Sequence, residues 1–235
     1  MNKKINSIVL FLIIAVLGSA IFMTGCSRDD SLTKVETLVQ GTLDAAYKGE
    51  AAEEYLELTG TTSDAIKKAF DESLKNDALF FCKYIGAFEE PTEDLFNALP
   101  KDTQDKVANL YRNIYLKTEY EVKDPEKEED GSYSIELTLK PLDVFQKAID
   151  KMNAGEYEPY NDFVRKYNTG EISEEDFSYR LINVMVALLE NSLEEAQAKE
   201  PKVFILKVTQ ESEDSDFALE QNTLNDIKDS MIIYP

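Results

Sequence analysis

The stretch "GSYSIELTLK", residues 131–140, decides the fold class because its apolar residues alternate strictly with polar ones. This period of two is typical of a strand with one buried face. The preceding stretch "KTEYEVKD" (117–124) alternates similarly, and the acidic "PEKEEDG" (125–131) between them ends in Asp130-Gly131, a pair that favours a tight turn. We therefore predict an antiparallel hairpin. Its buried face would carry Tyr133, Ile135, Leu137 and Leu139.

A second hairpin is predicted near the end of the chain. "KVFILKVTQ" (202–210) is rich in apolar and β-branched residues, as buried strands are. A shorter strand in "DFALEQN" (216–222) would follow across the acidic "ESEDS" (211–215). Two hairpins predict an antiparallel sheet.

Helical periodicity dominates elsewhere. Val35, Leu38 and Val39 begin a stripe at i, i+3, i+4 that continues to Tyr47. Ser173 opens a long helix with a pattern close to a capping box. The remaining predicted helices are 51–58, 62–86, one after Pro91, one after Pro100, 141–152, 160–167 and 223–232.

The fold class predicted by this order is α+β. N-terminal helices would pack on a curved antiparallel sheet made of the two hairpins, and residues 141–200 would form a helical insertion between the hairpins. We predict a single domain over residues 34–235, because a chain of this length can bury roughly 70% of its unfolded surface in one core.

Over residues 34–140 and 200–233 this order resembles the nuclear-transport-factor-2-like, or cystatin-like, superfamily. Its members have a curved sheet wrapped on a helix, often with an aromatic where Phe217 stands and an acid near Glu220. The resemblance implies a cone-shaped pocket. The insertion at 141–200 departs from the family and puts an open pocket in doubt. Fold alone does not decide function, because this superfold carries enzymes, ligand binders and interaction modules.

The N-terminus has the pattern of a secretory signal. Lys3 and Lys4 precede an uncharged apolar run from Ile8 to Phe22, and small residues follow. "MTGC" (23–26) resembles the lipobox of bacterial lipoproteins, although the family prefers Leu where Met23 stands. The resemblance implies a signal peptide over residues 1–25, a diacylglycerol on the sulfur of Cys26 with acyl chains such as palmitate, and a tether over 26–33.

This assignment places the protein on the extracytoplasmic face of the cell membrane. Arg28 stands where inner-membrane lipoproteins of Gram-negative cells carry Asp, and the chain resembles Gram-positive surface lipoproteins. Two alternatives remain open, namely a simple signal peptide and an uncleaved anchor, although the apolar run is short for a membrane span.

Composition excludes several functions. The chain has 46 acidic and 25 basic residues and a net charge of −21, so we expect no nucleic-acid binding, which needs basic side chains to neutralise phosphates. It has no histidine, which removes Ser-His-Asp and Cys-His catalysis and histidine-ligated metals. Cys82 lies in an apolar run and is interpreted as a small buried hydrophobe.

We expect a non-catalytic binding or interaction module whose partner is an envelope protein, a peptide or a small ligand, with no cofactor and no metal. An aromatic-rich segment is the candidate contact surface. The alternative is a small enzyme in which an Asp or Glu base acts beside a tyrosine. The contact surface would comprise Tyr157, Tyr160, Arg165 and Tyr167, and the enzyme would pair Tyr120 or Tyr133 with Asp216 or Glu220.

Overall fold

The computed structural model describes residues 30–210 and 216–235. The predicted signal peptide, Cys26 and the acidic stretch 211–215 lie outside the described residues. The chain forms two compact units, each assembled from segments that are distant in sequence. The first unit contains the residues up to Ser73, Thr118–Pro141 and Glu200–Met231, and the second contains Leu74–Lys117, Leu142–Lys199 and Ile232–Pro235. The prediction of a single domain over 34–235 stays a prediction.

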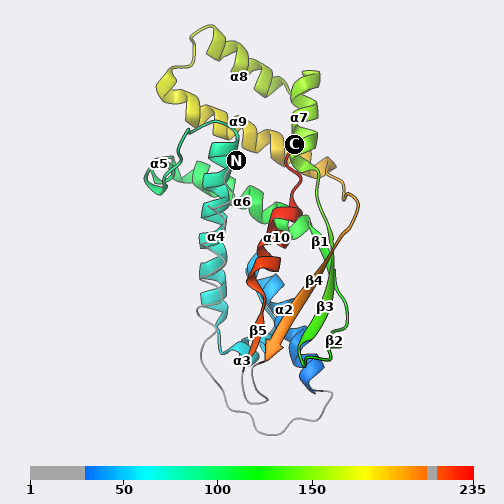
Figure 1. Ribbon diagram of the computed structural model, residues 1–235. Coiled ribbons are helices and arrows are strands. Elements are labelled where there is room, and N and C mark those ends of the chain that lie inside the picture. Colours follow the sequence, from blue (N-terminus) through cyan, green and yellow to red (C-terminus); the bar gives the residue numbers. More distant parts are fainter. Residues whose placement is uncertain (1–29, 211–215) are drawn as a thin grey trace. The chain divides into compact units, whose positions relative to one another are not determined.

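A curled antiparallel sheet forms one side of the first unit (Figure 1). Its strands follow the order β1-β3-β4-β5, and the short β2 also pairs with β3. Together with the helices, this sheet confirms the predicted α+β class. The strands are β1 (Glu119–Val122), β2 (Glu126–Lys127), β3 (Tyr133–Lys140), β4 (Lys202–Gln210) and β5 (Phe217–Leu219).

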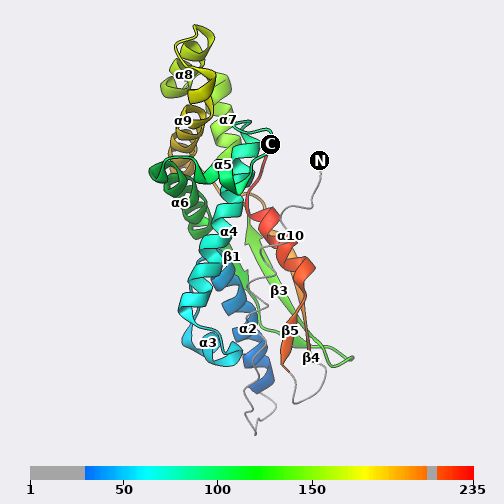
Figure 2. The ribbon, with the colours of Figure 1, turned by 90° about the vertical axis from the view of Figure 1, so that its left-hand side faces the viewer.

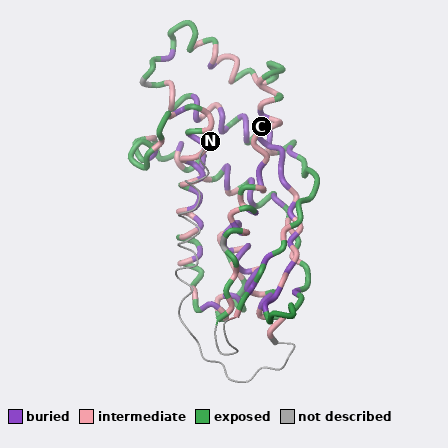
Figure 3. Tube along the Cα trace, viewed as in Figure 1, coloured by how far each residue is buried: buried purple, intermediate pink, exposed green. Residues whose placement is uncertain are grey.

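Strand β3 shows the predicted alternation, since its residues are alternately buried and half-buried along its whole length (Figure 3). Leu137 lies opposite Val122 of β1 and Phe204 of β4. The segment predicted as a loop is shorter than expected, because Glu126 and Lys127 pair with β3 as strand β2. The connection between β2 and β3 therefore consists of residues 128–132 only.

Helices α2 and α10 contact the sheet (Figure 2). Helix α2 contacts β1 and β5, whereas α10 contacts β3 and β4. Helix α2 begins at Asp30 rather than at residue 34, so residues 30–33, predicted as part of the tether, are already helical. The helices of this unit are α2 (Asp30–Tyr47), α3 (Glu53–Thr59), α10 (Gln221–Met231) and the first half of α4 (Ser63–Tyr84).

The contact between α2 and α3 depends on a glycine inside a helix. A Cβ placed on Gly41 would lie 2.1 Å from Cδ2 and 2.2 Å from Cγ of Tyr55. The Tyr55 ring is fully buried, and its hydroxyl lies 3.4 Å from Oγ1 of Thr42. Glycine normally weakens a helix by about 1 kcal/mol relative to alanine. Here it allows α3 to approach α2 closely.

We predict that Gly41→Ala destabilises the protein by about 1–3 kcal/mol, although the same change stabilises most helices. The added methyl group would push Tyr55 out of its site. Urea unfolding followed by circular dichroism measures the effect. In a Tyr55→Ala background the substitution should become neutral or favourable, because the clash is gone. Equal destabilisation in both backgrounds would show that the close approach is unimportant.

The second unit is built around helix α9, which contacts α6, α7 and α8. As predicted, Ser173 caps α9: its hydroxyl accepts a hydrogen bond of 3.1 Å from the backbone N–H of Asp176. The helices of this unit are α5 (Glu93–Asn97), α6 (Lys101–Lys117), α7 (Val144–Ala154), α8 (Glu158–Asn168), α9 (Glu174–Glu195) and the rest of α4.

The C-terminal tail packs into the second unit through Tyr234. Its ring lies 4.5 Å from the ring of Phe145, 5.2 Å from Tyr84 and 5.3 Å from Phe80. Aromatic pairs at such distances contribute about 0.5–1.5 kcal/mol beyond the area they bury. The tail is therefore part of the core of this unit.

Candidate functional site

The two tyrosines of the enzyme hypothesis contact other residues in the structure. The Tyr133 ring is buried in the first unit and packs edge-on against Phe217 at 5.7 Å. Asp216, just before β5, and Glu220, just after it, are both exposed. The hydroxyl of Tyr120 donates instead to a carboxylate that the sequence analysis did not consider, that of Asp44 on α2.

Asp44 is the centre of a polar cluster on one face of α2. Its Oδ1 accepts a hydrogen bond of 2.6 Å from the Tyr120 hydroxyl and lies 2.5 Å from Nζ of Lys48. Its Oδ2 accepts a bond of 2.9 Å from the side-chain amide of Gln40. Nζ of Lys48 also lies 5.0 Å from the centre of the Tyr120 ring, a cation–π distance. The Asp44 side chain is only 20% exposed.

The electrostatics of this cluster make Tyr120 a donor. Burial raises the pKa of its hydroxyl, and the hydrogen bond to the negative Asp44 raises it further. Tyr120 therefore stays protonated at neutral pH. Both oxygens of Asp44 are occupied by donors, whereas a general base needs a free oxygen within hydrogen-bond reach of its substrate. The arrangement suits an anchor that joins β1 to α2.

We predict that Tyr120→Phe lowers the free energy of unfolding by about 1–3 kcal/mol, because it removes a half-buried hydrogen bond to a charged group. Urea unfolding of Tyr120→Phe, Asp44→Ala and the double variant forms the test. Tyr120→Phe should cost clearly less in the Asp44→Ala background, since the bond is already lost there. Additive losses would contradict a direct interaction.

The second unit holds two more buried tyrosine contacts. The Tyr115 hydroxyl donates to Oδ2 of Asp77 at 2.8 Å, and the hydroxyls of Tyr111 and Tyr234 lie 3.2 Å apart. Burial raises the pKa of Tyr111 well above its ordinary value, and the neighbouring Tyr234 adds to the effect. Tyr111 therefore stays protonated at neutral pH, and both contacts satisfy polar groups inside this unit.

Asp143 is the most deeply buried carboxylate that pairs with a lysine among the described residues, with 2% of its side chain exposed. Its Oδ2 lies 2.7 Å from Nζ of Lys199, and its Oδ1 accepts a 2.8 Å bond from the N–H of Gln197. Burial acts to raise the pKa of Asp143, but Lys199 and Gln197 outweigh it and hold the pKa below the ordinary 3.8. The charged form therefore stabilises the fold.

A depressed folded-state pKa gives stability that is present above the ordinary carboxyl pKa and is lost as pH falls through the folded value. We therefore predict that Asp143→Asn destabilises the protein most at neutral pH, and that its deficit relative to the unsubstituted protein shrinks below about pH 4. Urea unfolding at pH 7, 5, 4 and 3 measures this. Asp150→Asn, at an exposed acid of α7, serves as control and should show no such trend. A deficit independent of pH would contradict the charged anchor.

The predicted contact residues lie on or next to helix α8. Tyr157 and Tyr160 are half-buried, whereas Arg165 and Tyr167 are exposed. The Tyr167 ring, 44% exposed, packs on Phe177 of α9 at 4.6 Å, and the buried Phe163 lies between Tyr160 and Phe177. Tyr167 and Phe163 thus join α8 to α9, whereas Tyr160 packs on Phe163 of its own helix. Their role in binding stays a prediction.

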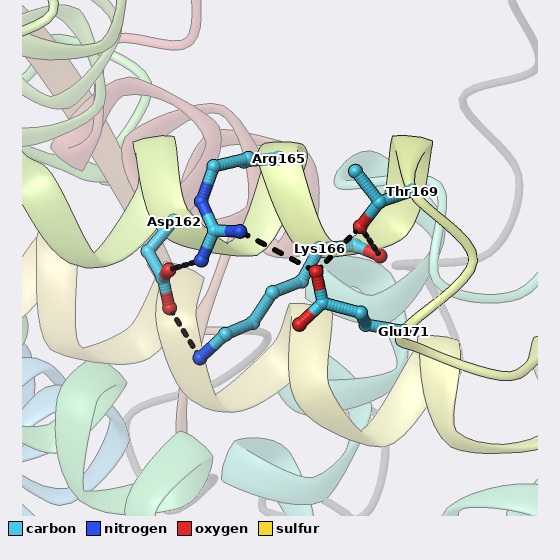
Figure 4. A network of polar contacts seen from close by, with 5 residues as sticks. All are labelled: Asp162, Arg165, Lys166, Thr169 and Glu171. Carbon is cyan, nitrogen blue, oxygen red and sulfur yellow. Dashed lines mark hydrogen bonds and ion pairs between the residues drawn. The ribbon is translucent and has the colours of Figure 1, made fainter.

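Arg165 is engaged by acids of its own unit (Figure 4). One guanidinium nitrogen lies 2.5 Å from Asp162, and the other lies 3.4 Å from Glu171. Lys166 also pairs with Asp162 at 2.7 Å, while the Thr169 hydroxyl donates to Glu171. An anionic ligand would have to displace these partners.

The two cysteines have different environments. Cys26 lies outside the described residues. Cys82 is confirmed as buried, with no exposed surface, and burial raises the pKa of its thiol to about 12. It therefore stays protonated and unreactive in the folded protein. Within 30–210 and 216–235 no group of three or more acids and cysteines is placed to hold a metal ion, and no helix there is long and apolar enough to cross a membrane.

Comparisons with known proteins give one fold likeness. No protein-family model and no curated protein matches the sequence. The fold resembles the crystal structure of "a putative lipoprotein (ycdA)" from Bacillus subtilis, with a TM-score of 0.56 and 14% sequence identity. The likeness covers 88% of this chain but only 58% of the Bacillus chain. At this identity it shows a shared fold.

Proposed function

We propose that the protein is a lipoprotein anchored to the extracytoplasmic face of the cell membrane through Cys26, and that it acts there as a non-catalytic binding or interaction module. The observation that carries the proposal is the "MTGC" lipobox after a charged start and an apolar run. Two acyl chains on one residue hold stably in a bilayer, whereas a single chain binds only reversibly.

The structural likeness supports this proposal. The similar Bacillus subtilis protein is described as "a putative lipoprotein", and the likeness covers 88% of this chain. We extend the proposal to the surface of a Gram-positive cell.

We further propose that the sheet is a variant of the nuclear-transport-factor-2-like arrangement, with residues 141–200 inserted between its two hairpins. The antiparallel pairing of β1 with β3 and of β4 with β5 supports it, as does the packing of α2 and α10 against these strands. The pairing of β3 with β4 joins segments on either side of the insertion.

A non-catalytic role is supported by the chemistry of the half-buried acid beside a tyrosine. Asp44 has donors on both oxygens and so acts as an anchor. Histidine, the usual general base at neutral pH, is missing from the sequence. The partner would be an envelope protein, a peptide or a small ligand, and Tyr167 with the neighbouring rings is the proposed contact surface.

We predict that the full chain, expressed in a Gram-positive host with radiolabelled palmitate, incorporates the label through Cys26. Cys26→Ala should incorporate none, and the mass of its N-terminal peptide should lack diacylglycerol. Cys82→Ala is the matched control and should incorporate the same amount of label as the unsubstituted chain, because Cys82 is buried. An unlabelled chain that carries both cysteines would overturn the lipid anchor.

A further inference from the structure

The start of α2 limits how far the first unit can lie from its anchor. Only Ser27, Arg28 and Asp29 separate Cys26 from Asp30, the first described residue of helix α2. A fully extended chain gains at most 3.3–3.6 Å per residue, so these links span no more than about 14 Å. If Cys26 carries the lipid, the beginning of α2 is held within about 14 Å of the bilayer surface.

We propose that the end of the first unit at which α2 begins faces the bilayer, and that the lipid surface is therefore the partner of this end. The inference rests on the lipidation of Cys26 proposed above. Figures 1 and 2 show that the loop between β2 and β3 and the last residues of β4 lie toward the same end of this unit. These segments would be the ones nearest to the membrane.

The charge of this end does not draw it to the membrane, so the covalent link has to hold it there. The loop between β2 and β3 carries Glu128, Glu129 and Asp130, and of these Asp130 is paired with Lys207 at 3.0 Å. An anionic bilayer repels acids within a Debye length, about 8 Å at physiological salt. The link of at most about 14 Å between Cys26 and Asp30 therefore keeps this end near the membrane against that repulsion.

Helix geometry converts this orientation into a measurable gradient. Glu36 lies in the second turn of α2, and Glu50 lies just beyond its C-terminal end; both are exposed. At 1.5 Å per residue the helix rises about 17 Å between Glu36 and its last residue, Tyr47, and Glu50 follows three residues later. The Asp44 cluster lies on the same helix, in its last turns, and would thus stand away from the lipid.

The experiment uses the full lipidated chain on vesicles of phosphatidylcholine and phosphatidylglycerol that carry an energy acceptor on their headgroups. A donor dye is attached in turn to Glu36→Cys and Glu50→Cys. The buried Cys82 and the acylated Cys26 do not react. We expect at least two-fold more energy transfer from position 36 than from position 50. Equal transfer from both positions would overturn the inference.

A longer tether provides the matched control. Twenty Gly-Ser residues inserted after Arg28 would add an r.m.s. length of about 25 Å and should bring the ratio of the two transfers close to one. An unchanged ratio would show that another contact orients the unit, and would overturn the inference. Flotation of the protein with the vesicles is measured in parallel. A chain that fails to float overturns the lipid anchor itself, whereas one that floats without a gradient overturns only the orientation.

Discussion

The first unit depends on the two-sided pairing of strand β3. This strand pairs with β1 and β2 along one edge, and its residues 133–139 pair with β4 along the other. Its inward side chains are at most 3% exposed, so a shift of register by one residue would move all of them to the other face of the sheet. Because exposing these side chains would cost free energy, the register in which β4 pairs with β3 is fixed. This holds although β4 begins more than sixty residues later in the chain. The inward side chains are Tyr133, Ile135, Leu137 and Leu139.

Local signals could predict the elements because they act over a few residues. The alternation in 131–140 identified β3, and the Ser173 pattern identified the start of α9. Gly131, with φ of +83°, adopts the left-handed conformation that the Asp130-Gly131 turn requires. The early start of α2 was missed because residues 30–34 contain a single apolar residue, Leu32, and so carry little periodicity. Strand β2 was missed because pairing with β3, rather than its own sequence, makes it a strand.

The polar cluster could be predicted only in part. Gln40, Asp44 and Lys48 are spaced four residues apart, so one helical face was foreseeable from the sequence. The hydrogen bond from Tyr120 to Asp44 could not be predicted. It requires β1 to pack against α2, and the two residues are seventy-six positions apart in the chain. Asp216 and Glu220 were predicted as partners of Tyr120 because they come shortly before α10 in the sequence. With 46 acids in the chain, only tertiary contacts distinguish an anchor from a solvated charge.

Asp44 and Asp143 show how a strongly acidic chain builds a stable interior. Each of these two carboxylates pairs with a lysine and accepts further hydrogen bonds. The free-energy cost of removing it from water is therefore offset by several interactions at once. Exposed acids, by contrast, contribute mainly to the net charge of −21 and keep the protein soluble. The same excess charge weakens any adhesion of the folded chain to anionic lipid or nucleic acid. An acidic chain of this kind would therefore need a covalent anchor to stay at a membrane. If Cys26 carries the proposed lipid, its short connection to α2 would decide which end the membrane meets.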